Sequence, residues 1–214
     1  MAKTKLYGHF CPSAHTLEII GEKWSLLIVR DLLPGPQRYT DLLGVLGHIT
    51  SKGLLIRLRD LEESGILVRD RLEGRREVWY SLTDKGRDLA PVLRELAIWG
   101  TKHAMRPPLH DEAVHPQHTI SALTFFLNKH PLTRQEPATW VFRFPGKPAY
   151  TIKFAGKRWI YNQGEEEADI VVETTPQTIA MLITAGPEES GALVNSLDIE
   201  GKAARVEEFI AAFG

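Results

Sequence analysis

"GHITSKGLLIRLRDLEESGILVRDRLEGRREVWYSLTDKG", residues 47–86, is the stretch that decides the fold, because the spacing of its apolar residues changes partway along it. Thr50 is a residue type that commonly caps the start of a helix, and Gly65 is one that commonly ends it. Between them, four leucines recur at helical spacing and form one apolar stripe, namely Leu54, Leu55, Leu58 and Leu61. The pattern predicts a helix over residues 51–64 with one buried side and one open side.

Beyond Gly65 the pattern is typical of strands. Residues 66–72 and 77–82 are rich in β-branched and aromatic side chains, and Gly74 lies between them, which predicts a β-hairpin. A short helix is expected over Thr40–Leu46, with Thr40 as its N-cap. The three residues 47–49 then form the turn that leads to the helix at 51–64. A short helix, a turn, a second helix and a hairpin follow one another in a winged helix-turn-helix domain.

Two longer helices are expected on either side of this unit. Apolar spacing predicts the first over Ala14–Leu33 and the last from Thr83 to Met105. The last helix has more apolar positions than a small domain needs, so some are expected to serve a dimer. The proline-containing segment 107–117 reads as a linker. The chain is therefore expected to be an α+β protein with an N-terminal domain over residues 1–106 and a C-terminal domain over residues 118–214.

The open side of the helix at 51–64 is expected to enter the major groove of double-stranded DNA, where base edges carry distinguishable donor and acceptor patterns. Gly53 would let the backbone come close to the DNA, and arginines of the hairpin would reach phosphates. The residues expected to contact DNA are Arg38, Thr50, Ser51, Lys52, Gly53, Ile56, Arg57, Arg71, Arg75 and Arg76. Arg59 is expected to project away from the groove and to pair with Glu62 or Glu63. The alternative is an ordinary solvated helix face and cross-strand ion pairs in the hairpin.

The net charge of −1 conceals an asymmetry along the chain. Residues 1–110 hold 17 lysines and arginines against 13 acidic residues, whereas residues 111–214 hold 9 against 14. A basic front and an acidic back suggest different partners for the two domains, and the basic one suits a polyanion.

Composition narrows the class of protein. The lone cysteine, Cys11, cannot form an intramolecular disulfide, and the histidine and cysteine spacings do not match a structural metal site. The sequence contains no signal-peptide pattern and no apolar run near 18 residues, so a cytoplasmic protein without a membrane partner is expected. No nucleophile and base pattern, phosphate-binding loop or dinucleotide fingerprint occurs, so neither an enzyme nor a bound cofactor is expected.

Residues 10–100 resemble the HxlR-type winged helix-turn-helix regulators. The matching elements are Cys11-Pro12, Gly21-x-Lys23-Trp24, Arg38-Tyr39, Leu55-x-x-Arg57-Leu58-x-x-Leu61-Glu62, Gly65 and Tyr80-x-Leu82-Thr83-x-x-Gly86. The resemblance implies a homodimeric transcriptional regulator, expected to be a repressor, paired through its first and last long helices on a palindromic operator. Half-sites of such an operator lie about 34–36 Å apart or a multiple of it.

The C-terminal domain is expected to hold a helix, four strands and then further helices. Its segment 168–213 is similar to sterol-carrier-protein-type lipid-binding domains, which implies an apolar cavity between a sheet and covering helices, and thus a small apolar or amphipathic effector. The residues expected to line this cavity are Trp140, Phe142, Phe144, Tyr150, Ile152 and Phe154. A filled core explains the same residues equally well, and the domain would then be purely structural or dimerising.

Cys11 offers a second route to regulation. In some regulators that resemble this chain, a cysteine at the Cys-Pro position senses oxidants or electrophiles, and the thiolate is the reactive form. Cys11 precedes an expected helix start, which favours the thiolate. The alternative is a small buried apolar residue without a redox role.

Overall fold

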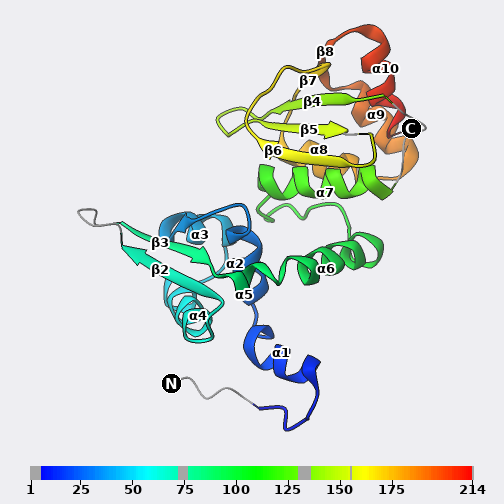
Figure 1. The fold of residues 1–214 in the computed structure, drawn as a ribbon. Coiled ribbons are helices and arrows are strands. Elements are labelled where there is room, and N and C mark those ends of the chain that lie inside the picture. The colour runs from blue at the N-terminus through cyan, green and yellow to red at the C-terminus, as the bar shows by residue number, and fades with distance from the viewer. Residues whose placement is uncertain (1–5, 72–76, 130–135, 155, 214) are drawn as a thin grey trace. The chain divides into compact units, whose positions relative to one another are not determined.

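The structure is a computed structural model that describes residues 6–71, 77–129, 136–154 and 156–213 (Figure 1). The chain divides into two compact units, residues 1–96 and 97–214. The division falls inside a helix, upstream of the boundary expected at residue 106. Within the described part of the chain, no helix combines the length and the apolar character that crossing a membrane requires.

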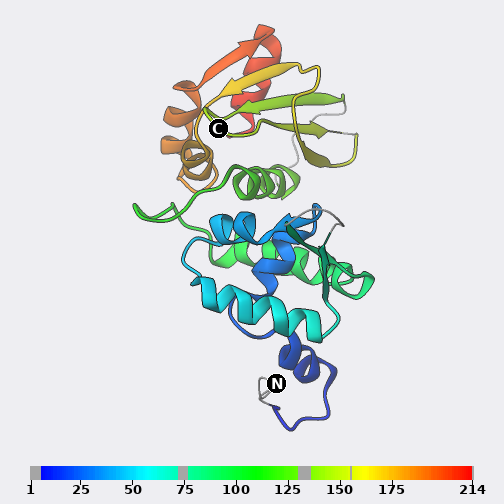
Figure 2. The same ribbon diagram turned by 90° about the vertical axis from the view of Figure 1, so that its left-hand side faces the viewer.

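The first unit is mainly helical, with a small sheet whose strand order is β1-β3-β2 and whose pairings are antiparallel (Figures 1 and 2). Its elements, with the helix that extends past residue 96, are α1 (Pro12–Ile20), α2 (Ser25–Leu32), β1 (Gln37–Arg38), α3 (Tyr39–Leu46), α4 (Ser51–Glu63), β2 (Leu67–Arg71), β3 (Val78–Leu82), α5 (Asp84–Arg87) and α6 (Ala90–His103). The order of α3, α4 and the β2–β3 hairpin confirms the predicted winged helix-turn-helix.

Helix α4 has the ends that the sequence predicts. The Thr50 hydroxyl oxygen accepts a hydrogen bond from the Gly53 N–H at 3.0 Å, and Gly65, with φ of 69°, follows the end of the helix. Three of its leucines are at most 2% exposed and pack in the core of the unit, namely Leu54, Leu58 and Leu61. Leu55 is 50% exposed, so its assignment to the buried stripe was wrong. Successive residues of a helix are turned by about 100°, and position 55 therefore falls on the open side.

The expected helix over Ala14–Leu33 is in fact two helices, α1 and α2. Gly21 ends α1 in a place where a side chain would collide with the Leu17 carbonyl, and Trp24, at the N-cap of α2, has a left-handed φ of 85°. The unusual backbone at Trp24 turns the chain between the two helices.

Two other helix predictions also need correction. The expected helix over residues 83–105 is divided into α5 and α6, with Thr83 capping α5 through the Gly86 N–H at 3.1 Å. The N-cap of α3 is Arg38 rather than Thr40, and the Arg38 N–H donates to the Asp41 carboxylate at 3.2 Å. The carboxylate of Asp41, at the third position of the helix, thus accepts the hydrogen bond that the backbone N–H of the N-cap residue donates.

The second unit contains a five-stranded sheet of order β6-β5-β4-β7-β8, in which only the β4–β7 pair is parallel. Its elements after α6 are α7 (Pro116–Lys129), β4 (Ala138–Arg143), β5 (Tyr150–Phe154), β6 (Trp159–Gln163), β7 (Ile170–Glu173), α8 (Pro176–Leu182), α9 (Pro187–Asn195), β8 (Asp198–Gly201) and α10 (Ala203–Ala211). Residues 104–115, which contain most of the expected linker, form neither helix nor strand.

One acidic segment, residues 164–169, connects edge strand β6 to β7 on the far side of β4 and β5. The Thr151 hydroxyl donates to the Gly164 carbonyl at 2.7 Å, and Arg143 pairs with Glu165 at 2.8 Å. Lys153 pairs with Glu166. These contacts attach the segment to β4 and β5, the strands that it crosses.

Candidate nucleic-acid interface

The open side of α4 carries a stripe of four exposed residues. Lys52, Leu55, Ile56 and Arg59 are spaced as i, i+3, i+4 and i+7, which places them on one side of the helix. Leu55 is 50% and Ile56 41% exposed, on the side that faces away from the buried leucines. We call these four residues the α4 stripe. It combines two apolar side chains with a cation near each end.

Arg57, which the sequence assigns to base contact, lies outside this stripe. Its side chain is only 18% exposed and pairs with Asp60 at 2.9 Å and with Glu22 at 3.5 Å. Arg59 is exposed instead, and among the ion pairs of the described residues none includes it. The orientations predicted for the two side chains are therefore reversed, since Arg57 packs against the domain and Arg59 is exposed to solvent. Helical spacing from the buried Leu54 and Leu61 was the signal that would have separated them. Arg57 lies three residues after Leu54 and four before Leu61, on the same side of the helix, whereas Arg59 lies five after and two before, on the other side.

The first turn of α4 is fixed by hydrogen bonds to its backbone. Besides the Thr50 cap, the Tyr39 hydroxyl of α3 donates to the Ser51 carbonyl at 2.9 Å and so links the two helices of the motif. At Gly53 a Cβ atom would lie 3.0 Å from the Thr50 hydroxyl oxygen. Close packing against the cap thus explains this glycine without the DNA approach that the sequence suggested.

Arg38 is in β1, opposite Trp79 of β3, near the Arg71–Val78 end of the β2–β3 pairing. Its guanidinium lies 4.8 Å from the centre of the Trp79 ring, and Nη1 pairs with Glu77 at 3.0 Å. The side chain remains 43% exposed. The cation–π contact and the ion pair hold the charge beside the sheet, where a phosphate could still reach it.

The hairpin arginines are only partly described. Arg71 is the last residue of β2 and is opposite Val78 of β3, whereas Arg75 and Arg76 lie outside the described residues. Arg69 of β2, which was not among the predicted DNA contacts, is exposed on the same strand.

Cys11 is an exposed, free thiol at the N-cap of α1, so the interpretation as a buried apolar residue was wrong. Hydrogen bonds from the backbone N–H groups of Ala14 and Ser13 lower the pKa of this thiol below its ordinary value. The start of a helix favours a negative charge for the same reason. Within the described residues, no three or more His, Cys, Asp or Glu side chains are grouped so as to hold a metal ion.

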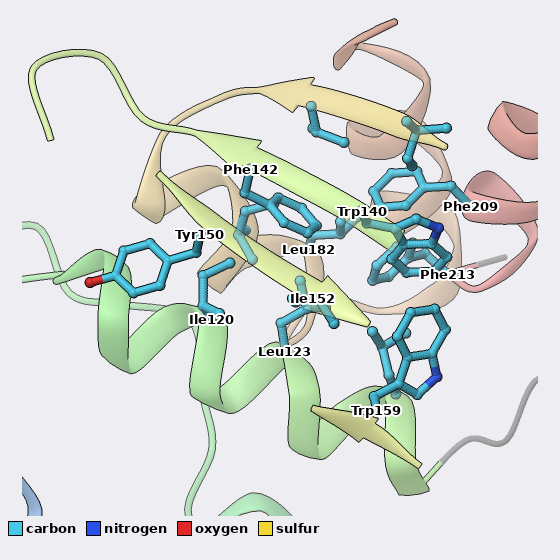
Figure 3. Close-up of a cluster of buried hydrophobic side chains, with 14 of the residues drawn as sticks. Ile120, Leu123, Trp140, Phe142, Tyr150, Ile152, Trp159, Leu182, Phe209 and Phe213 are labelled. Carbon is cyan, nitrogen blue, oxygen red and sulfur yellow. The ribbon is translucent and has the colours of Figure 1, made fainter. Parts of the chain in front are cut away.

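The six residues expected to line an effector cavity lie in the core of the second unit. Figure 3 labels Trp140, Phe142, Tyr150 and Ile152 among them. Five of the six are at most 4% exposed, namely Trp140, Phe142, Phe144, Tyr150 and Ile152, while Phe154 is half-buried. Trp140 contacts Phe209 edge-on at 5.0 Å between ring centres. Side chains of the surrounding helices fill the space against the sheet, so in this structure these residues form packed core.

A small pocket of about 130 Å³ lies elsewhere in the second unit. Its lining residues are Thr101, Met105, Ala122, Phe126, Lys129 and Ile183, and none of the six residues above is among them. Pockets that enclose drug-sized ligands usually measure about 300–1,000 Å³, so this one is small for a lipid.

Comparison with known proteins places the first unit in a family. A family model described as HxlR-like helix-turn-helix matches residues 19–108. The uncharacterized HTH-type transcriptional regulator YvaP of Bacillus subtilis (strain 168) is 38% identical over 97 residues, covering 44% of this chain and 90% of that protein. The uncharacterized HTH-type transcriptional regulator sll1512 of Synechocystis sp. (strain ATCC 27184 / PCC 6803 / Kazusa) is 44% identical over 87 residues, covering 40% of this chain and 64% of that protein.

Among solved structures, the redox regulator HypR in its oxidized form is similar, with 33% sequence identity and a TM-score of 0.42. The match covers 44% of this chain and 97% of HypR.

Proposed function

This chain belongs to the HxlR-like helix-turn-helix family and is a DNA-binding transcriptional regulator, and we propose that it represses transcription as a homodimer on a palindromic operator. The observation that carries this proposal is the α4 stripe. A helix with a capped first turn, three buried leucines on one side and Lys52 and Arg59 on the other has the shape and charge that the major groove accepts.

Exposed apolar residues support the homodimer. Helix α6 has no buried residue, and four of its side chains are 41–60% exposed, namely Val92, Leu96, Ile98 and Trp99. On α1, Leu17 is 47% exposed. Exposed apolar surface of this kind commonly marks a site of protein–protein interaction.

Sedimentation equilibrium tests the dimer. We expect the wild-type protein to sediment as a dimer and Leu96→Glu to sediment as a monomer that retains its helical circular dichroism. Lys102→Glu, an exposed change of charge on the same helix, is the matched control and should remain dimeric. A monomeric wild-type protein at the concentration where it binds DNA would contradict the proposal.

Fluorescence anisotropy with DNA fragments from the neighbourhood of the gene tests operator binding. The expected result is a preferred site with two half-sites about 34–36 Å apart and an affinity that falls steeply with salt. A reporter placed behind that site should be silenced by the protein. An increase in reporter expression would show an activator instead.

The second unit supports two alternative roles within this proposal. As a packed core it would be structural or dimerising, whereas binding of a small apolar effector would require the helices to move off the sheet. Native mass spectrometry of the purified protein and thermal shifts with fatty acids, sterols and aromatic acids distinguish the two. A bound mass or a concentration-dependent shift supports the effector, and the absence of both supports the structural role.

Redox or electrophile sensing by Cys11 is a second candidate, favoured by the exposure of the thiol and its lowered pKa. We expect diamide to change operator binding by the wild-type protein and to leave Cys11→Ser unaffected. Equal binding before and after treatment of the wild-type protein would remove this candidate.

A further inference from the structure

We infer that the α4 stripe selects an operator half-site in which thymine methyl groups lie between two guanines. The inference rests on the proposed function, because it assumes that α4 enters the major groove. It goes beyond that function by assigning a base chemistry to each side chain of the stripe.

The two apolar residues of the stripe carry the first step. Leu55 and Ile56 are about half exposed and lie between the two exposed cations of the stripe, Lys52 and Arg59. The C5-methyl group of thymine is the apolar feature of the major groove, whereas the other groups on the base edges donate or accept hydrogen bonds. A cytosine or guanine edge against these side chains would lose water without gaining a partner. Thymine is therefore the base that this part of the stripe favours.

The two cations of the stripe carry the second step. Lys52 and Arg59 are exposed, and among the ion pairs of the described residues none engages either side chain. Lysine and arginine donate to the O6 and N7 acceptors of guanine, and arginine can do so with two parallel hydrogen bonds. Arg57, which is held by Asp60 and Glu22, is not available in the same way.

Spacing along the helix sets the order of the bases. Seven residues separate Lys52 from Arg59, which is about 10.5 Å at roughly 1.5 Å per residue. Successive bases on one strand are about 3.4 Å apart, so the two cations lie about three base steps apart. Leu55 and Ile56 lie midway between them, so we expect the thymines to lie between the two guanines in the half-site.

Selection from a random DNA library gives the first half of the test. We expect the wild-type protein to enrich half-sites with thymines between two guanines, and Arg59→Ala to lose the preference for one guanine. Leu55→Ala and Ile56→Ala should relax the preference at the thymines only. Arg57→Ala is the matched control and should enrich the same sequence as the wild-type protein.

Replacement of thymidine by deoxyuridine gives the second half, because it removes only the methyl group and needs no protein variant. For the wild-type protein we expect about fourfold weaker binding per replaced central thymine, the effect of one buried methyl group. For Leu55→Ala and Ile56→Ala, the same replacement should weaken binding less than twofold at the thymine that each side chain contacts.

Three results separate the inference from the function on which it rests. A wild-type protein that selects a clear operator but binds the deoxyuridine form equally well overturns the inference and leaves the DNA-binding regulator intact. Enriched half-sites without central thymines do the same. Failure to enrich any sequence overturns the proposed operator binding itself.

Discussion

Arg57 and Asp60 lie about one turn apart on α4 with 2.9 Å between Nη1 and Oδ2, so the protein's own carboxylate holds this arginine. Because the pair is only partly exposed and has a second carboxylate, Glu22, beside it, Arg57 serves the packing of α4 in its domain. We expect Arg57→Gln to lower the free energy of unfolding by at most about 1 kcal/mol and to leave the preferred operator unchanged.

The companion variant Arg59→Ala is expected to change operator binding and not stability. Loss of a base-contacting arginine should weaken binding to the preferred site by about 1–3 kcal/mol without changing stability. Urea unfolding and fluorescence anisotropy measure both quantities on the same samples. An Arg57→Gln protein that loses sequence preference while Arg59→Ala keeps it would restore the assignment made from sequence.

Gly86, in α5, should tolerate no side chain. A Cβ atom there would collide with the Ile66 carbonyl and approach a methyl group of Leu82 to 3.1 Å. We expect Gly86→Ala to lower the free energy of unfolding by about 1–3 kcal/mol. Gly44→Ala, in α3, is the control, because nothing lies within 4 Å of its Cβ position, and alanine should raise stability by about 0.5–1 kcal/mol. Equal effects of the two substitutions would argue against the packing at Gly86.

The Cys11 thiol should react with iodoacetamide at lower pH in the folded protein than in the unfolded one. Backbone N–H groups at the start of α1 stabilise the thiolate, so the folded pKa lies below the unfolded value. The resulting contribution to stability is present above the unfolded pKa and is lost as the pH falls through the folded pKa. Alkylation rates followed by mass spectrometry across pH 5–10 in buffer and in urea give the two midpoints, and coincident midpoints would refute the prediction.

Glu165 should titrate at a lower pH in the folded protein than a free glutamate does. The hydrogen bonds and charge of Arg143 lower the pKa of this carboxyl group. Its contribution to stability is therefore complete above the unfolded pKa and disappears as the pH falls through the folded pKa. Carboxyl-carbon NMR, assigned by comparison with Glu165→Gln, measures the titration. Because the pair is exposed, 1 M salt should move the midpoint back toward the ordinary value, and a salt-independent midpoint would exclude the ion pair as its cause.

The sequence predicted those parts of the first unit in which local chemistry decides the structure. Thr50 and Gly65 bound α4 as expected because a hydroxyl cap and a left-handed glycine act within one turn of the chain. The break at Trp24 could not be foreseen in the same way. The residues on both sides favour a helix, and a bulky residue at positive φ is tolerated only when the surrounding structure holds it there.

In the candidate site, too, contacts between residues far apart in the sequence were not predicted. Lys52 and Ile56 fell on the expected side of α4, but Arg57 and Arg59 were exchanged. Helical spacing from the buried leucines would have separated the two arginines. The pairing of Arg57 with Glu22, far from α4 in the sequence, could not be foreseen in that way. In the second unit, aromatic strand residues such as Trp140 fit a cavity or a core equally until the helices that cover them are placed.

The parallel pairing of β4 with β7 has a consequence for how the second unit folds. Strands β4, β5 and β6 form a meander of neighbours in sequence, which can pair as soon as they are made. Central strand β4 gains its other neighbour only when the acidic segment 164–169 has crossed the sheet and delivered β7. Closing that loop costs entropy before the new contacts repay it, so we expect the meander to form first and the docking of β7 to set the folding rate.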